Sequence, residues 1–226
     1  MIKRGVVLII VACRLALLPA CAHLPGQPSP SARPENPSQV TDFIRLYAGN
    51  CAGCHGADGQ FGAALPLNNP AYLAIVADVS VRDAIANGIN GTSMPAFAIA
   101  SGGILTDAQV TAIVSGIRSH WGNSAVLPSG TPPYLAEGAG DPASGAKLFG
   151  AYCASCHGDR GTGGKAGAVA DGSFLALYND QSLRTLIIAG RPDFGHFGWH
   201  DYPGKAPLAS AQVGDLVAWL AAQRQS

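Results

Sequence analysis

The chain has 226 residues, of which 48% are hydrophobic and only 12% are charged, and it contains 29 glycines and 16 prolines. This composition excludes a charge-rich disordered protein and a coiled coil, and the length allows one large domain or two small ones. Fourteen basic residues balance fourteen acidic ones, so the composition gives no basis for nucleic-acid binding.

The N-terminal segment, residues 1–20, has the features of an export signal. Two positive residues, Lys3 and Arg4, precede an apolar stretch that is too short to span a bilayer. The four residues that end at Cys21 resemble the lipobox of bacterial lipoproteins and predict a lipid anchor on that cysteine. Cleavage after Ala22 at an A-x-A pattern is the alternative. We therefore expect the mature chain on the periplasmic side of a bacterial membrane, lipid-anchored or, in the alternative, soluble in the periplasm.

Residues 21–38 are expected to form an extended tether, because they contain five prolines and no apolar periodicity. The rest of the chain is one unit repeated at an offset of 102 residues, which aligns Cys51 with Cys153 and keeps many later residues in register. Residues 39–122 and 140–226 are therefore predicted to be duplicated domains. The segment 123–139, rich in glycine and proline, is predicted to link them.

Each half is predicted to fold as three helices around an irregular loop. The expected helices span 41–49, 80–87, 106–120, 142–152, 182–189 and 210–223. Thr106 and Gln109 have the spacing of a capping box, and Gly88 and Gly190 are placed to end the middle helices. Since no strand pattern competes with these helices, the predicted fold class is all-α.

Each half carries one C-x-x-C-H motif. The motifs consist of Cys51, Cys54 and His55, and of Cys153, Cys156 and His157. This pattern is typical of covalent haem attachment, in which the two thiols add to the haem vinyl groups and the histidine ligates the iron. A single C-x-x-C would also suit half of a zinc site or a redox dithiol, but neither needs the adjoining histidine. We therefore predict two covalent haem c groups, haem 1 in the first half and haem 2 in the second.

Both halves resemble class I cytochrome c domains, and the chain beyond the tether resembles a dihaem cytochrome c. The resemblance implies two tandem domains, each a few helices wrapped around a haem. It also implies that the first and last helices of each half pack against each other. In the second half the contact is expected between Gly145, Phe149 and Trp219. In the first half it is expected between Phe43, Tyr47 and Gly116, where large and small residues exchange.

The resemblance also concerns groups around the haems. In the family, the carbonyl of a proline before a leucine accepts a hydrogen bond from the iron-ligating histidine, and Pro66 matches that proline for His55. Ala168 takes the corresponding place in the second half. Arg82 and Arg184 recur at the same position of the repeat, either as contacts to haem propionates or as solvated charges near a helix start.

The sixth iron ligand separates the two halves. Met94 lies where the resemblance places an axial methionine, so haem 1 is expected to have His55 and Met94 as ligands. The repeat offset carries Met94 onto His196, which departs from the family's methionine but is a competent iron ligand. Haem 2 is therefore expected to have His157 and His196, with His200 as the rival of His196.

Iron with two protein ligands has no free position for a substrate, so these ligand sets imply electron transfer. Thioether sulfur favours ferrous iron more than imidazole does, so haem 2 should have the lower potential and pass electrons to haem 1. The predicted function is that of a membrane-tethered dihaem electron carrier. The resemblance implies a respiratory chain, with a quinol-oxidising or dehydrogenase complex and a terminal oxidase as redox partners. The alternative is a haem enzyme in which peroxide or a sulfur compound displaces the distal ligand of haem 2.

Overall fold

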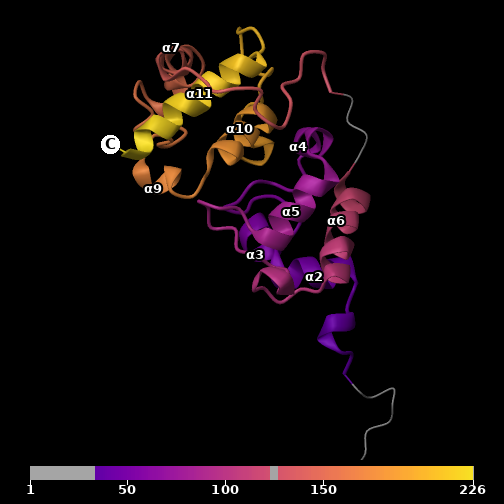
Figure 1. Cartoon of the computed structure of the whole chain (residues 1–226). Coiled ribbons are helices and arrows are strands. Elements are labelled where there is room, and N and C mark those ends of the chain that lie inside the picture. The colour runs from indigo at the N-terminus through magenta and orange to yellow at the C-terminus, as the bar shows by residue number, and fades with distance from the viewer. Residues whose placement is uncertain (1–33, 123–126, 226) are drawn as a thin grey trace, which may run out of the picture. The chain divides into compact units, whose positions relative to one another are not determined.

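The computed structural model describes residues 34–122 and 127–225 (Figure 1). Within these ranges it contains ten α-helices and no β-strand beyond two isolated bridges, so the predicted all-α class is confirmed. No helix among the described residues has both the length and the apolar character needed to cross a membrane. The predicted export signal, Cys21 and the first part of the tether lie outside the described residues.

The first half contains five α-helices. They are α2 (Phe43–Asn50), α3 (Ala52–His55), α4 (Pro70–Ile75), α5 (Asp78–Asn87) and α6 (Asp107–Trp121), with the 3₁₀ turns η3 (Pro37–Gln39) and η4 (Ile99–Ser101). The predicted capping box opens α6: the Thr106 N–H donates to Gln109 Oε1 at 2.9 Å, and the Gln109 N–H donates to Thr106 Oγ1 at 3.3 Å. α5 ends at Gly88, as predicted.

The second half repeats this order. Its helices are α7 (Pro142–Tyr152), α8 (Ala154–His157), α9 (Gly172–Leu175), α10 (Asp180–Ala189) and α11 (Ser210–Ala222), with η5 (Pro192–Phe194) and η6 (Gln223–Gln225). The prediction of three helices in each half was wrong in number. The additional helices have only four to six residues, which is too short for an apolar period to reveal them.

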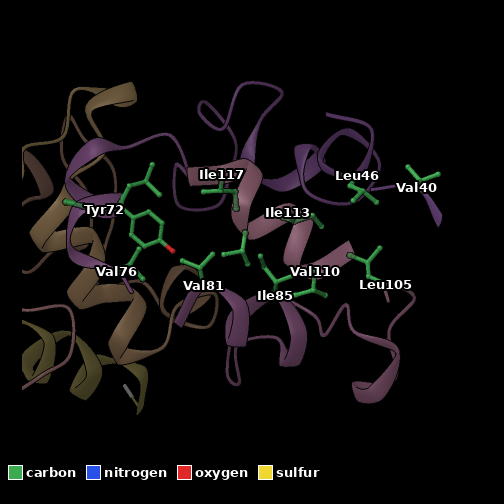
Figure 2. Packing of buried hydrophobic residues seen from close by; sticks show 13 residues of the cluster. Val40, Leu46, Tyr72, Val76, Val81, Ile85, Leu105, Val110, Ile113 and Ile117 are labelled. Carbon is green, nitrogen blue, oxygen red and sulfur yellow. The ribbon is translucent and has the colours of Figure 1, made fainter. Parts of the chain in front are cut away.

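One apolar core fills the first half between α5 and α6. Val81 and Ile85 of α5 face Val110, Ile113 and Ile117 of α6 (Figure 2). The other buried members of this cluster are Val40, Leu46, Tyr72, Leu73, Val76, Leu105, Val114 and Ala189. Because burying a Val, Leu or Ile side chain contributes roughly 1.5–3 kcal/mol, this core stabilises the packing of α5 against α6.

The predicted contact between the first and last helices of each half is confirmed. In the second half, α7 and α11 approach so closely that a Cβ on Gly145 would lie 2.0 Å from a backbone carbonyl oxygen of α11. Beside this point the rings of Phe149 and Trp219 pack with their centroids 4.3 Å apart. In the first half the large residue is on the other helix, since a Cβ on Gly116 would lie 2.1 Å from the Phe43 ring.

The two halves share packing within one compact unit, which begins at Ser38. α10 contacts both α11 and α4 (Figure 1). The Asn69 side chain caps α4 by accepting from the Ala71 N–H at 2.9 Å, and its amide donates to the Ala189 carbonyl of α10 at 3.0 Å. The buried side-chain amide of Asn69 therefore links α4 of the first half to α10 of the second.

Candidate haem sites

The two C-x-x-C-H motifs have the same local structure. In each, the first cysteine ends one helix and begins the four-residue helix α3 or α8, so the two sulfur atoms stand three residues apart on neighbouring helical positions. All four thiols are free of disulfide bonds. Burial, with a smaller contribution from the second thiol of the motif, raises the pKa of Cys51 to about 11 and that of Cys153 to about 12. In the unmodified chain these thiols are therefore neutral near pH 7.

The loop after each motif folds back onto it. A Cβ on Gly62 would lie 2.2 Å from the Cys54 carbonyl oxygen, and a Cβ on Gly164 would lie 2.4 Å from that of Cys156. No real Cβ approaches a carbonyl oxygen so closely, and only glycine permits this approach. Both halves thus wrap the attachment helix in the same way.

The histidine of each motif is buried and oriented by a backbone carbonyl. His55 Nδ1 lies 2.8 Å from the Leu65 carbonyl oxygen, and His157 Nδ1 lies 2.9 Å from that of Gly167. The exposed fractions of the two histidines are 8% and 7%. Burial lowers the pKa of His55. A hydrogen bond from Nδ1 leaves Nε2 of each ring available to a metal.

These acceptors correct one expectation. The predicted carbonyls, those of Pro66 and Ala168, each lie one residue beyond the observed ones. In the first half the residue before proline is confined to extended backbone, which fixes the direction of the Leu65 carbonyl. The second half reaches the same register without a proline, so the fold of the loop determines which carbonyl accepts.

The distal loops of the two halves are built on equivalent glycines. Gly88 ends α5 with φ 72° and ψ −174°, and Gly190 ends α10 with φ 68° and ψ −174°, a region that essentially only glycine occupies. A Cβ on Gly88 would lie 2.8 Å from the Met94 carbonyl oxygen, and one on Gly190 would lie 2.7 Å from that of His196. The residues that the repeat offset aligns therefore meet the same glycine in both halves.

The surroundings of His196 fit an iron site. Its ring centroid lies 6.0 Å from that of His157. A metal–nitrogen bond of about 2 Å plus ~1.1 Å from nitrogen to ring centre places two imidazoles on opposite sides of a metal at about this separation. His196 Nδ1 is buried and finds no hydrogen-bond partner among the described residues, although such nitrogens are normally paired. Burial and the nearby His157 imidazole both lower the pKa of His196.

His200 occupies a different environment from His196. Its side chain is 37% exposed, and Nε2 lies 3.3 Å from Asp201 Oδ1. Its ring also packs beside Trp199, with centroids 5.1 Å apart. His200 thus has partners at the surface, whereas His196 is turned toward His157.

The two recurring arginines bind protein groups. Arg82 of α5 forms an ion pair with Asp107 of α6. Arg184 of α10 is buried and donates from Nη2 to the Pro133 carbonyl at 2.9 Å and to Ser210 Oγ at 3.0 Å. For Arg184 both alternatives in the sequence analysis were wrong, because its guanidinium is neither solvated nor free for a propionate.

Arg191 and Asp193 form a functional pair that no sequence motif indicates. They form a bidentate ion pair in the loop before His196 and bind the loop that follows the first C-x-x-C-H motif. No local motif could have revealed this, because the groups that they bind lie about 130 residues earlier in the chain.

Known proteins share this organisation. The family model for cytochrome c oxidase, cbb3-type, subunit III matches residues 38–115 and 140–220. The chain is 31% identical over 152 residues to the cbb3-type cytochrome c oxidase subunit FixP of Azorhizobium caulinodans. The aligned region covers 64% of this chain and 48% of FixP. It is also 27% identical over 203 residues to the cytochrome bc1 complex cytochrome c subunit of Mycobacterium tuberculosis. This aligned region covers 85% of this chain and 69% of that subunit.

A second oxidase subunit, CcoP of an Azospirillum strain, is 30% identical over 131 residues, which cover 53% of this chain and 40% of that protein. The chain therefore spans less than half the length of the two oxidase subunits. The two segments matched by the family model cover well over half of the chain, and each contains one C-x-x-C-H motif. The chain belongs to the cytochrome c oxidase, cbb3-type, subunit III family and is a c-type cytochrome built from tandem cytochrome c domains.

Proposed function

We propose that this cytochrome is a periplasmic, membrane-tethered dihaem protein that transfers electrons within a respiratory chain. A covalently bound haem c supplies one-electron chemistry through the ferrous and ferric states of its iron. The attaching residues would be Cys51 and Cys54 for haem 1, and Cys153 and Cys156 for haem 2. His55 and His157 would be the proximal ligands, each held in one orientation by its Nδ1 hydrogen bond.

The distal ligands that we propose are Met94 for haem 1 and His196 for haem 2. The observation that carries this assignment is the shared approach of Gly88 to Met94 and of Gly190 to His196. The unpartnered Nδ1 of His196 and its distance from His157 support it further. By contrast, His200 is exposed and paired with a carboxylate.

Two protein ligands on each iron favour electron transfer over catalysis, because neither site then offers a place to a substrate. The mixed ligand set makes haem 2 the site of lower potential, since thioether sulfur stabilises ferrous iron relative to imidazole. We therefore expect electrons to enter at haem 2 and to leave from haem 1. The family relatives named as subunits of a cbb3-type oxidase and of a bc1 complex support partners in respiratory complexes. We propose a quinol-oxidising or dehydrogenase complex as donor and a terminal oxidase as acceptor.

Carbon monoxide binding to the fully reduced holoprotein tests this function. A carrier with two retained distal ligands should bind little carbon monoxide. Substantial binding at one haem would contradict the carrier and support the alternative enzyme, in which a small substrate displaces His196. Replacing His196→Met should raise the lower of the two reduction potentials, whereas the control His200→Ala should leave both unchanged. If His196→Met leaves both potentials unchanged, His196 is not the ligand.

The membrane tether requires a separate test, because Cys21 lies outside the described residues. Cys21→Ala should move the protein from the membrane fraction to the soluble periplasmic fraction of its host. A variant that stays with the membrane would contradict lipid anchoring at this cysteine.

A further inference from the structure

The loop that carries His196 contains a buried ion pair. Arg191 Nε donates to Asp193 Oδ1 at 3.0 Å, and Arg191 Nη2 donates to Asp193 Oδ2 at 2.8 Å. The two side chains are only 12% and 2% exposed. Bidentate geometry and burial give this pair one defined position, whereas exposed ion pairs exchange between many.

The pair binds both ends of a two-residue segment in the first half. Asp193 Oδ2 accepts from the Phe61 N–H at 3.0 Å, and Arg191 Nη2 donates to the Gly62 carbonyl at 2.9 Å. The next residue is tied to the second half as well, since the Tyr178 hydroxyl donates to the Ala63 carbonyl at 3.2 Å. The loop after the first C-x-x-C-H motif is therefore fastened to the second half by three hydrogen bonds.

The backbone conformation of Phe61 indicates that these hydrogen bonds hold the segment in one particular conformation. Among the described residues Phe61 is the one non-glycine residue with positive φ, at 61°. A side chain in this region is unfavourable, and it persists where the surroundings impose it. Here the surroundings include the Phe194 ring, edge-on to Phe61 at 6.1 Å, and the Arg191 guanidinium, which lies 4.6 Å from the centre of that Phe194 ring.

Each side of the pair leads to a candidate haem site. On one side, the Gly62 backbone lies against the attachment helix of haem 1, as its close approach to Cys54 shows. On the other, the Arg191 N–H donates to the His196 carbonyl at 3.1 Å, and the His196 N–H donates to the Arg191 carbonyl at 2.9 Å. The guanidinium of Arg191 therefore contacts the attachment loop of haem 1, while its backbone pairs with that of His196 in the distal loop of haem 2.

We propose that Arg191 and Asp193 form an interhaem latch, which fixes the attachment loop of haem 1 against the distal loop of haem 2 and influences the potentials of both haems. The latch deepens the proposed function and rests on it, because it presumes a haem in each half. Arg191 and Asp193 are positioning residues, since they act through Gly62, Phe61 and the His196 backbone. A feature of the distal loop alone would affect only haem 2, but the latch must affect both.

Two variants of the full-length holoprotein leave opposite charges at this pair, which is neutral overall in the wild type. Arg191→Gln leaves the Asp193 carboxylate, which stabilises the ferric states and should lower both reduction potentials. Asp193→Asn leaves the Arg191 guanidinium, which disfavours the ferric states and should raise both potentials. Arg82→Gln is the matched control, because it breaks an arginine–aspartate pair that lies within the first half. Spectroelectrochemical titration measures the two potentials separately.

A third variant separates charge from position. Arg191→Lys keeps the positive charge but loses the planar guanidinium that binds Asp193 through two hydrogen bonds. The potentials should therefore stay near those of the wild type, while the hydrogen bonds to Phe61 and Gly62 weaken. Hydrogen exchange of the Phe61 amide measures how stable its hydrogen bond to Asp193 is, and this measurement does not depend on electron transfer. We expect this amide to exchange about tenfold faster in Arg191→Gln and Arg191→Lys, and at the wild-type rate in Arg82→Gln.

Two results would overturn the latch. One is a potential of haem 1 that stays unchanged in both charge variants, and the other is a Phe61 amide that exchanges at the wild-type rate in both arginine variants. Either result, in protein that carries both haems and binds little carbon monoxide, refutes the latch and leaves the proposed function standing. Wild-type protein that lacks a haem, or binds carbon monoxide strongly, refutes the proposed function instead.

Discussion

The glycine that ends α10 provides a sharp test of how the distal loop is held. In Gly190→Ala, the new Cβ would lie 2.7 Å from the His196 carbonyl oxygen and 2.8 Å from backbone atoms of Phe197 and Gly198. These are atoms of the loop itself, so it cannot yield by rotating a side chain. The loop that carries His196 must therefore move away from α10.

The cost of this substitution has two parts. The backbone angles of Gly190 lie in a region essentially reserved for glycine, which costs other residues about 1–3 kcal/mol. The overlap of the new methyl group adds about 1–3 kcal/mol, as overpacking usually does. The expected loss is thus about 2–6 kcal/mol, which for a chain of this size lowers Tm by on the order of 10 °C.

Gly195→Ala, in the same loop, is the matched control. Gly195 also has positive φ, but its angles are those of the ordinary left-handed region, and a Cβ there would meet nothing within 4 Å. Its expected cost is only about 1–2 kcal/mol. In thermal unfolding of the holoprotein, Gly190→Ala should be clearly less stable than Gly195→Ala, and it alone should gain carbon monoxide binding at haem 2. Equal stability of the two variants, or carbon monoxide binding by neither, would refute the packing argument.

Three further predictions concern packing and pH. Phe149→Ala should cost about 3–5 kcal/mol in denaturant unfolding because Phe149 is only 2% exposed, whereas Leu135→Ala, at a residue 64% exposed, should change stability by less than about 0.5 kcal/mol. Gly116→Ala should cost about 1–3 kcal/mol through its overlap with Phe43, and adding Phe43→Leu should recover part of that loss; strictly additive effects in the double-mutant cycle would contradict the contact. The hydrogen bond from Arg191 holds the pKa of Asp193 below its usual range, so the stability that this carboxylate contributes is present above about pH 3.9 and lost as pH falls through the lower folded value. The difference in unfolding free energy between wild type and Asp193→Asn should accordingly shrink below about pH 4, and a difference that stays constant from pH 7 to 3 would contradict this.

Local signals in the sequence predicted most of the helical framework. The capping box at Thr106 forms hydrogen bonds of the expected kind, and Gly88 and Gly190 end their helices as expected. These features depend on residues three or four positions apart, so the sequence alone contains the information. α4 also has such a local signal, because Asn69 caps its first turn and Pro70 follows at the first helical position.

Features that depend on distant residues could not be predicted in this way. The buried position of Arg184 depends on Pro133 and Ser210, which approach it from opposite directions along the chain. The latch joins Arg191 to Gly62, and neither residue carries a motif that names its partner. The repeat offset pointed to His196, but the shared contacts of the two glycines became visible only once the loops were folded.

The central claim is that each half of this cytochrome carries a covalently attached haem. Intact-mass measurement of the purified protein from its native host tests this claim most directly, because thioether-linked haem remains on the chain after denaturation. The expected result is one polypeptide with the added mass of two haem groups. A polypeptide with one haem or none would contradict the account.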